Sequence, residues 1–240
     1  MNTLAALSAL ALLGALSWSA THPQTIRYSA PRAAAIERGR ADAQTDALAI
    51  ALQASSTPLG DAVLSQFAAR YQELVSQGDV SSSTAASAAD IMPEVSYKTY
   101  STADVATDPD VSLQRVIRYR SDLRLALMPL LNSTTPEFEL YARYVDTRNE
   151  THLDRLKAVA ADYRVAIAQT LKVKAPRDAS ARHLAVLDAM SRFAATLDAL
   201  ADNAKDPIAS VALLRAYNEA ERSMFTSFDA LGRYAAAKAL

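Results

Sequence analysis

The sequence predicts an all-α protein, an elongated up-and-down bundle of four to five helices that follows an N-terminal hydrophobic helix. Half of the 240 residues are hydrophobic, and many of these are alanine. The alternation of apolar and polar residues that is typical of strands is scarce, whereas apolar residues recur at helical spacing. The chain also has only five glycines, no two of them close together, so its helices are interrupted mainly at prolines and polar turns.

Residues 1–20 are expected to be a signal anchor or a signal peptide. The run from Leu4 to Trp18 contains no charged residue. A transmembrane helix needs roughly 20 apolar residues, so the run is at the lower limit for an anchor, and its length also suits the apolar part of a secretory signal. Trp18 fits an interfacial aromatic residue and favours the anchor. A buried core helix fits poorly, because the run has no polar face.

The expected location is therefore the cell membrane, with a single span and an extracytoplasmic domain, or outside the cell if the signal is cleaved. Basic residues follow the apolar run rather than precede it, a distribution that favours keeping the next domain inside. The side of the membrane is left open. The basic residues in question are Arg27, Arg32, Arg38 and Arg40.

Residues 21–56 are polar and are expected to form a spacer, and the helical bundle domain is expected to occupy residues 57–240. Its first helix begins at Thr57-Pro58, because threonine is a good N-cap and proline is favoured at the first helical position. Gly78 is expected to end this helix. Its apolar stripe consists of Leu59, Val63, Phe67, Tyr71 and Leu74.

A long loop is expected at residues 79–107, which are rich in serine, threonine and alanine at first and carry tyrosines later. A loop of this length inside a compact domain is either functional or disordered. Tyr97 and Tyr100 would form an exposed aromatic pair suited to protein recognition. Ser101 and Asp104 have the spacing of a capping box, with aspartate in place of glutamate.

The next helix opens at Asp108-Pro109 or at Ser112, and Pro129 must kink or end it. Arginines recur along it and resemble a basic patch for phosphate or another anion. Asp122 lies four residues after Arg118, however, and this spacing favours an ion pair on a solvated helix face. The four arginines are Arg115, Arg118, Arg120 and Arg124, and the expected inward stripe is Leu113, Val116, Ile117, Leu123, Leu127 and Leu131.

A start signal follows at Thr135-Pro136-Glu137, and no glycine or proline then occurs as far as Val173. If continuous, this helix would be roughly 55 Å long, with a polar gap at residues 146–152. Phe138, Tyr141, Val145, Leu153, Leu156, Ala160, Tyr163 and Ile167 form its expected inward face.

Two further helices are expected, one capped by Asp178 and ending near Asn203, the other capped by Asp206 before Pro207. Short turns would make the last three helices antiparallel neighbours. The inward residues are expected to be Leu184, Leu187, Ala194, Leu197 and Ala201 in the first, and Ile208, Val211, Leu214, Met224, Phe228, Leu231 and Ala235 in the second. Tyr141, Tyr144, Tyr163, Tyr217 and Tyr234 are expected to pack in the core rather than to stack on a ligand.

The composition argues against several classes of chemistry. The absence of cysteine excludes disulfides and thiolate sites, and the scattered glycines form no phosphate-binding loop. A net charge of −1 gives no field that attracts nucleic acid. None of the three histidines has a glutamate three residues before it, as di-iron bundles require, and there is no Gly-x-Ser-x-Gly motif. We therefore expect a non-enzymatic protein without catalytic residues, cofactor or bound metal.

One histidine lies in an acidic setting. His152, beside Asp146, Glu150 and Asp154, would help to bind a metal only across helices. A solvated polar surface is the better explanation of this cluster, and a half-buried, hydrogen-bonded residue that of His183.

The order of these features resembles a group of uncharacterised membrane-anchored helical proteins of small-genome candidate phyla bacteria. The likeness is carried by the N-terminal apolar segment and spans most of residues 56–235. A looser architectural likeness is to the helical minor pilus-tip subunits of type IV secretion systems. These resemblances imply a helical architecture and a place in the cell envelope, but no activity. The residues concerned are Ser56-Thr57-Pro58, Tyr97-Lys98-Thr99-Tyr100, Pro176 with His183-Leu184, and Asp206-Pro207.

The expected function is a structural or protein-interaction role in the cell envelope. Expected partners are envelope proteins, such as those of a secretion or pilus system, and the membrane through residues 1–20, with no nucleic acid; self-association is left open. The alternative is a sensor-like module that binds a small ligand or metal between helices near Arg118, Tyr141 or His152. The candidate interaction residues are Tyr97, Tyr100, Arg118, Tyr141 and His152.

Overall fold

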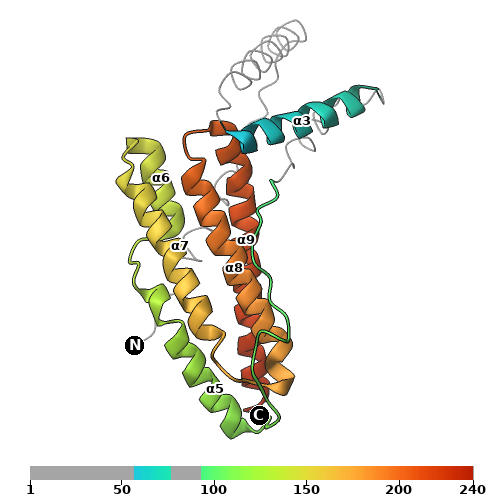
Figure 1. Cartoon of the computed structure of the whole chain (residues 1–240), viewed down its shortest axis with the longest axis vertical. Coiled ribbons are helices and arrows are strands. Elements are labelled where there is room, and N and C mark those ends of the chain that lie inside the picture. Colours follow the sequence, from blue (N-terminus) through green and yellow to red (C-terminus); the bar gives the residue numbers. More distant parts are fainter. Residues whose placement is uncertain (1–56, 77–92, 240) are drawn as a thin grey trace, which may run out of the picture. The chain divides into compact units, whose positions relative to one another are not determined.

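A computed structural model describes residues 57–76 and 93–239 of the chain (Figure 1). The predicted segments 1–20 and 21–56, the predicted stop at Gly78 and the first part of the loop lie outside the described residues. The all-α class is confirmed. The α-helices are α3 (Pro58–Ser76), α5 (Leu113–Ala126), α6 (Glu137–Thr147), α7 (Thr151–Thr170), α8 (Ser180–Asp202) and α9 (Pro207–Ala237), and the short elements are η2 (Met128–Leu131), η3 (Arg177–Ala179), β1 (Thr107–Asp108) and β2 (Ala175–Pro176). No helix in the described part combines the length and hydropathy needed to cross a membrane.

Helices α7, α8 and α9 are successive antiparallel neighbours, and α5 and α6 lie one after the other along α7 (Figure 1). The core between them contains an aromatic cluster in which the Phe193 ring lies 5.1 Å from that of Tyr163 and 5.3 Å from that of Tyr217. The hydroxyl groups of the two tyrosines reach Glu137 and Glu221, each at 3.2 Å. All five tyrosines assigned to the core by the sequence are buried, as predicted.

The long helix expected between residues 137 and 173 is instead two helices joined by a tight turn. Arg148 has φ of 56°, in the left-handed region, and its N–H donates to the carbonyl of Tyr144. The Asn149 side chain then accepts a hydrogen bond of 3.0 Å from the N–H of Thr151 and starts α7. The chain reverses within the polar gap because its side chains have no apolar face to bury in a longer helix. The break expected at Pro129 is confirmed, since η2 separates α5 from α6.

The inward face of α5 differs from the expected one. Leu113, Ile117 and Leu131 are exposed, whereas Arg115 and Tyr119 are buried beside Val116, Leu123 and Ala126. Ser112 is the N-cap, as one of the two alternatives predicted, and its Oγ accepts from the N–H of Arg115 at 3.3 Å. The helix is rotated because polar contacts of Arg115 and Tyr119 hold these two side chains inside.

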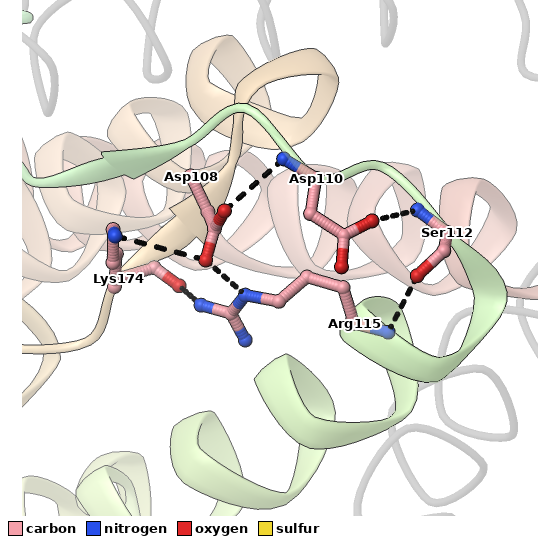
Figure 2. Close-up of polar contacts among 5 residues, drawn as sticks. All are labelled: Asp108, Asp110, Ser112, Arg115 and Lys174. Atoms are coloured by element: carbon pink, nitrogen blue, oxygen red, sulfur yellow. Dashed lines mark hydrogen bonds and ion pairs between the residues drawn. The ribbon is translucent and has the colours of Figure 1, made fainter.

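Arg115 belongs to a cluster of polar residues that fastens the start of α5 to the rest of the bundle (Figure 2). Its Nε donates to Asp108 Oδ2 at 2.8 Å, and its guanidinium also donates to the carbonyl of Lys174. Asp108 accepts the N–H of Asp110 at 3.1 Å, and this bond is the main reason why its pKa is lowered. Asp108 belongs to β1, which pairs in parallel with β2, and Lys174 directly precedes β2, so the cluster joins two distant segments.

Tyr119 is held by a second buried polar contact. Its hydroxyl lies 2.9 Å from Nδ1 of His183, which is completely buried on α8. Burial lowers the pKa of His183, because it disfavours the imidazolium, while the Thr170 carbonyl acts in the opposite direction. The half-buried position expected for His183 is therefore wrong, and its hydrogen-bond partner is the Tyr119 hydroxyl rather than the backbone or acidic group that we expected.

Two further expectations on α8 and α9 are corrected. Asp178 does not cap α8, which begins at Ser180 after η3; its carboxylate instead accepts from the Tyr234 hydroxyl at 2.6 Å and pairs with Lys238 at 2.8 Å. Val211 is exposed rather than inward. The first half of α9 packs largely through alanines, which allow a close approach to α8. These are Ala209, Ala212, Ala216 and Ala220, and Leu213 is buried among them.

The two expected caps at Thr57 and Asp206 are confirmed, and they meet. Asp206 Oδ1 accepts the N–H groups of Ile208 and Ala209, both at 3.0 Å, and starts α9. Its other oxygen, Oδ2, accepts the N–H of Thr57 at 3.0 Å and the Thr57 hydroxyl at 2.8 Å. Asp206 is completely buried, so this one carboxylate connects the starts of α3 and α9.

Candidate interaction groove

The tyrosine-bearing segment expected to serve recognition is extended and lies along the bundle. Residues 93–100 form neither helix nor strand, and they lie along α8, with whose side chains they line a common groove. Pro93 is buried, and Val95 and Tyr100 pack partly on the core. We call residues 93–100 the strap.

The strap is held at its C-terminal end. The N–H of Tyr100 donates to Asp188 Oδ1 on α8 at 2.7 Å. Ser101 then donates through its N–H and its hydroxyl to Asp104 Oδ2, each at 2.8 Å, as the capping-box spacing predicted, although a turn and not a helix follows. The hydrogen bonds from Ser101 lower the pKa of Asp104. Beyond this turn, the β1–β2 pairing and the Arg115 cluster fix the chain.

A groove of about 820 Å³ lies between the strap and helices α7 and α8. Small side chains on the two helices make room for it, namely Ala168 on α7 and Ser191, Ala194, Ala195 and Ala199 on α8. Larger apolar side chains from three elements complete the floor, and they are Leu59, Val95, Ile167 and Leu171. The groove is thus apolar at its base and bounded on one side by extended backbone.

Charged groups of both signs surround this apolar base. Arg164 on α7 forms an ion pair with Asp198 on α8, and both line the groove. The Nζ atom of Lys98 lies 5.0 Å from the ring centre of Tyr100, a cation–π contact. The pKa of Tyr100 is raised, first by burial and then by Asp188 and Asp104, so its hydroxyl stays protonated as a hydrogen-bond donor.

The backbone of the strap offers donors and acceptors that other described residues do not use. Within residues 57–76 and 93–239, the backbone groups of residues 94–99 make no hydrogen bond; the first that does is the N–H of Tyr100. Exposed extended backbone of this kind can be paired by a second extended chain. At roughly 3.3 Å per residue, residues 94–99 present about 20 Å of it.

The five residues singled out by the sequence do not form one site. Tyr97, which is 39% exposed, and Tyr100 line the groove together. Arg118 is exposed on α5, and Tyr141 is buried on α6. His152 is half-buried at the start of α7, whereas α5 reaches the opposite end of α7 through Arg115 and Lys174. A helix of 20 residues is about 30 Å long, so Arg118 and His152 are far apart.

The metal alternative finds no support in the described residues. No group of three or more histidine, aspartate or glutamate side chains that suits a metal ion occurs among them. His152 Nδ1 is buried without a hydrogen-bond partner within the same residues, and so is Nε2 of His183.

Sequence reasoning missed the helical walls of the groove. Ser191, Ala195 and Ala199 recur every four residues and therefore share one face of α8, which was the available signal. Asp188 and Asp198 lie among the many charged residues of the helices and gave no signal of their own. No protein-family model matches this chain, and neither the curated proteins nor the solved structures contain a match to it.

Proposed function

We propose that this chain is a non-catalytic interaction protein of the cell envelope, tethered or exported by residues 1–20, whose groove binds an extended segment of a partner protein. The observation that carries the proposal is the backbone of residues 94–99 at the edge of the groove, which forms no hydrogen bond with any other residue that the structure describes. The uncharged run from Leu4 to Trp18 supports the location.

The groove suits an extended peptide for three reasons. Backbone pairing supplies affinity in this mode of recognition, and side-chain pockets supply specificity. The alanines on α7 and α8 leave space for alternate side chains of the peptide, and Tyr97 offers an exposed aromatic ring at the rim. Lys98, Arg164 and Asp198 provide charges of both signs for polar groups of the partner.

The first experiment asks whether the groove meets a protein in intact cells. The photo-crosslinking residue benzoylphenylalanine replaces Tyr97 in the tagged full chain, and Phe225, an aromatic residue of α9 that is 52% exposed, carries the same replacement as the control. Reproducible crosslinks to the same envelope protein from position 97, and not from position 225, are expected. Equal crosslinking from both positions, or crosslinks only to cytosolic proteins, would contradict the proposal.

A second experiment tests the peptide directly. Peptides selected from a display library on the full chain are expected to slow amide hydrogen exchange in residues 94–99, because their backbone pairs with the strap. Ala168→Trp fills the groove, and Ala158→Trp on the same helix lies outside it; both alanines are exposed, so neither change disturbs the core. Binding is expected to be lost in the first variant only. Peptides that bind both variants equally would refute the groove as the site.

A small ligand is the second candidate for this groove. Its volume of about 820 Å³ falls within the range of roughly 300–1,000 Å³ that is typical of small-molecule sites. Native mass spectrometry of the purified full chain distinguishes the two candidates, since a retained small molecule that Ala168→Trp displaces favours the sensor-like function.

A further inference from the structure

Helix α5 presents an apolar face that no described residue covers. Leu113, Ile117 and Leu125 are 44%, 49% and 65% exposed. At 100° per residue they lie within a sector of roughly 120° on the side opposite the buried residues of the helix. Met128 and Leu131 in η2, which follows α5 directly, are also exposed, at 49% and 71%. These side chains do not stabilise the bundle while they are in water, and a contiguous exposed apolar surface marks a contact site for another molecule.

Three arginines share this face. Arg120 and Arg124 fall within or beside the same sector, and Arg118 lies at its edge; all three are exposed. The ion pair expected between Arg118 and Asp122 is not among those that the described residues form, and Arg120 and Arg124 form none there either. Asp122 is the only acidic residue of the helix. Asp110, just before the helix, is near enough to Arg118 for an electrostatic interaction, but three arginines against Asp122 leave the helix surface with an excess of positive charge.

The position of α5 leaves the face accessible. The helix is fastened on its inner side, through Arg115 and Tyr119, and it lies at the edge of the bundle beside α7 (Figure 1). The 14 residues of α5 span about 21 Å at 1.5 Å per residue, and the outer surface of a helix is convex. A convex helix suits a broad, planar surface.

We propose that the exposed face of α5 lies on an anionic lipid surface. Amphipathic helices that rest in a membrane interface combine an apolar face with arginine or lysine, as this face does. The arginine stems can cover acyl chains while the guanidinium groups pair with lipid phosphates. This contact is separate from the groove and does not depend on the function proposed for it.

Residues 1–20 are themselves expected to bind membranes, so binding of the full chain to vesicles does not test α5. The test therefore measures the environment of one labelled position on α5. The chain has no cysteine, so a single introduced thiol can carry the environment-sensitive label nitrobenzoxadiazole. Leu125→Cys places the label on the proposed face, and Val211→Cys, at a residue of α9 that is 62% exposed, is the matched control. Vesicles consist of phosphatidylcholine and phosphatidylglycerol in a ratio of roughly two to one, or of phosphatidylcholine alone.

Mixed vesicles are expected to shift the emission at position 125 to the blue and to leave position 211 unchanged. In the Leu125→Cys chain, replacing Arg118, Arg120 and Arg124 by glutamine should weaken the response on the order of 100-fold in lipid concentration, about 1 kcal/mol for each arginine near an anionic surface. Replacing them by lysine should restore most of it, because lysine keeps the charge. The three side chains are exposed, so an unchanged circular dichroism spectrum is expected in both variants.

Each of the following results would overturn the proposal. They are an unchanged label at position 125 on mixed vesicles, an equal response on phosphatidylcholine alone, and an equal response at position 211. A label at position 125 that responds to polyglutamate but not to vesicles would also overturn it, and would assign the face to an acidic protein instead.

Discussion

The contact between Thr57 and Asp206 makes a quantitative prediction about how α3 is attached. Asp206→Ala removes the acceptor of four hydrogen bonds, two from the start of α9 and two from Thr57. Asp206→Asn is the informative partner variant. It retains one oxygen for the cap of α9 but places an amide NH₂ group opposite the N–H of Thr57.

The magnitudes follow from these bonds. Loss of an N-cap costs about 1 kcal/mol, and hydrogen bonds to a charged acceptor contribute about 1.5–3 kcal/mol each. Because the contacts of Thr57 are only partly buried, we take the lower value for them and expect Asp206→Ala to reduce the free energy of unfolding by about 4 kcal/mol. Asp206→Asn should cost about 3 kcal/mol, and Thr57→Ala about 2.5 kcal/mol, of which about 1 kcal/mol is the lost cap of the Gly60 N–H.

The assay is urea denaturation of the full chain, followed by circular dichroism at the helix band, on Thr57→Ala, Asp206→Asn and the double variant. If the two residues stabilise the fold through each other, the cycle should give a coupling energy of about 1–2 kcal/mol. Thr57→Ala also removes the acceptor of the Gly60 N–H, but this loss appears equally with and without Asp206 and cancels in the cycle. Additivity within about 0.3 kcal/mol would refute the reasoning.

Three further predictions concern buried charge, backbone strain and the strap. The pKa of His183 in the folded protein is lowered by burial below its ordinary 6.5, so the unfolded chain takes up more protons on acidification. The contribution of His183 to the free energy of unfolding should be complete above about pH 6.5 and decrease below it, as measured by the urea midpoint between about pH 7.5 and pH 5. His183→Gln should remove this dependence on pH. A dependence equal to that of the wild type would assign it to other groups. Arg148→Gly should raise the free energy of unfolding by about 0.5–1 kcal/mol, because glycine adopts the φ of 56° without strain. Arg148→Ala should not raise it. A lower free energy of unfolding in Arg148→Gly would mean that the cation–π contact with Tyr144 outweighs the strain. Asp188→Ala removes the acceptor of the Tyr100 N–H and should accelerate amide hydrogen exchange in the strap but not in α8, so unchanged exchange at Tyr100 would show that other contacts hold the strap.

The comparison of sequence and structure separates strong local signals from weak ones. The starts at Thr57, Ser112 and Asp206 and the break at Pro129 were predictable, because caps and prolines act through the backbone within a few residues. The turn at Arg148 was not, because arginine has no preference for the left-handed region and the only local sign was a polar gap. Asp178 had the residue type of a cap but is used by Tyr234 and Lys238, 56 and 60 positions away.

The candidate site was predictable in part for the same reason. Tyr97 and Tyr100 stand out in a long loop, and both line the groove. Arg164 and Asp198 do not stand out, because surface helices carry many such residues and only the packing of α7 against α8 brings these two together. Arg118 is separated from Tyr141 and His152 because α5 and α6 lie at opposite ends of α7, an arrangement that no single helix encodes.

The sequence by itself determined that the described chain is helical, where most helices begin and which tyrosines lie inside, since these depend on local caps and on apolar spacing. Tertiary structure alone decided the rotation of α5. Leu113 and Ile117 offered as good an apolar stripe as any, but the buried contacts of Arg115 with Asp108 and of Tyr119 with His183 turned the other face inward. The partners of those contacts lie on other segments of the chain, so the spacing of apolar residues within one helix cannot predict them.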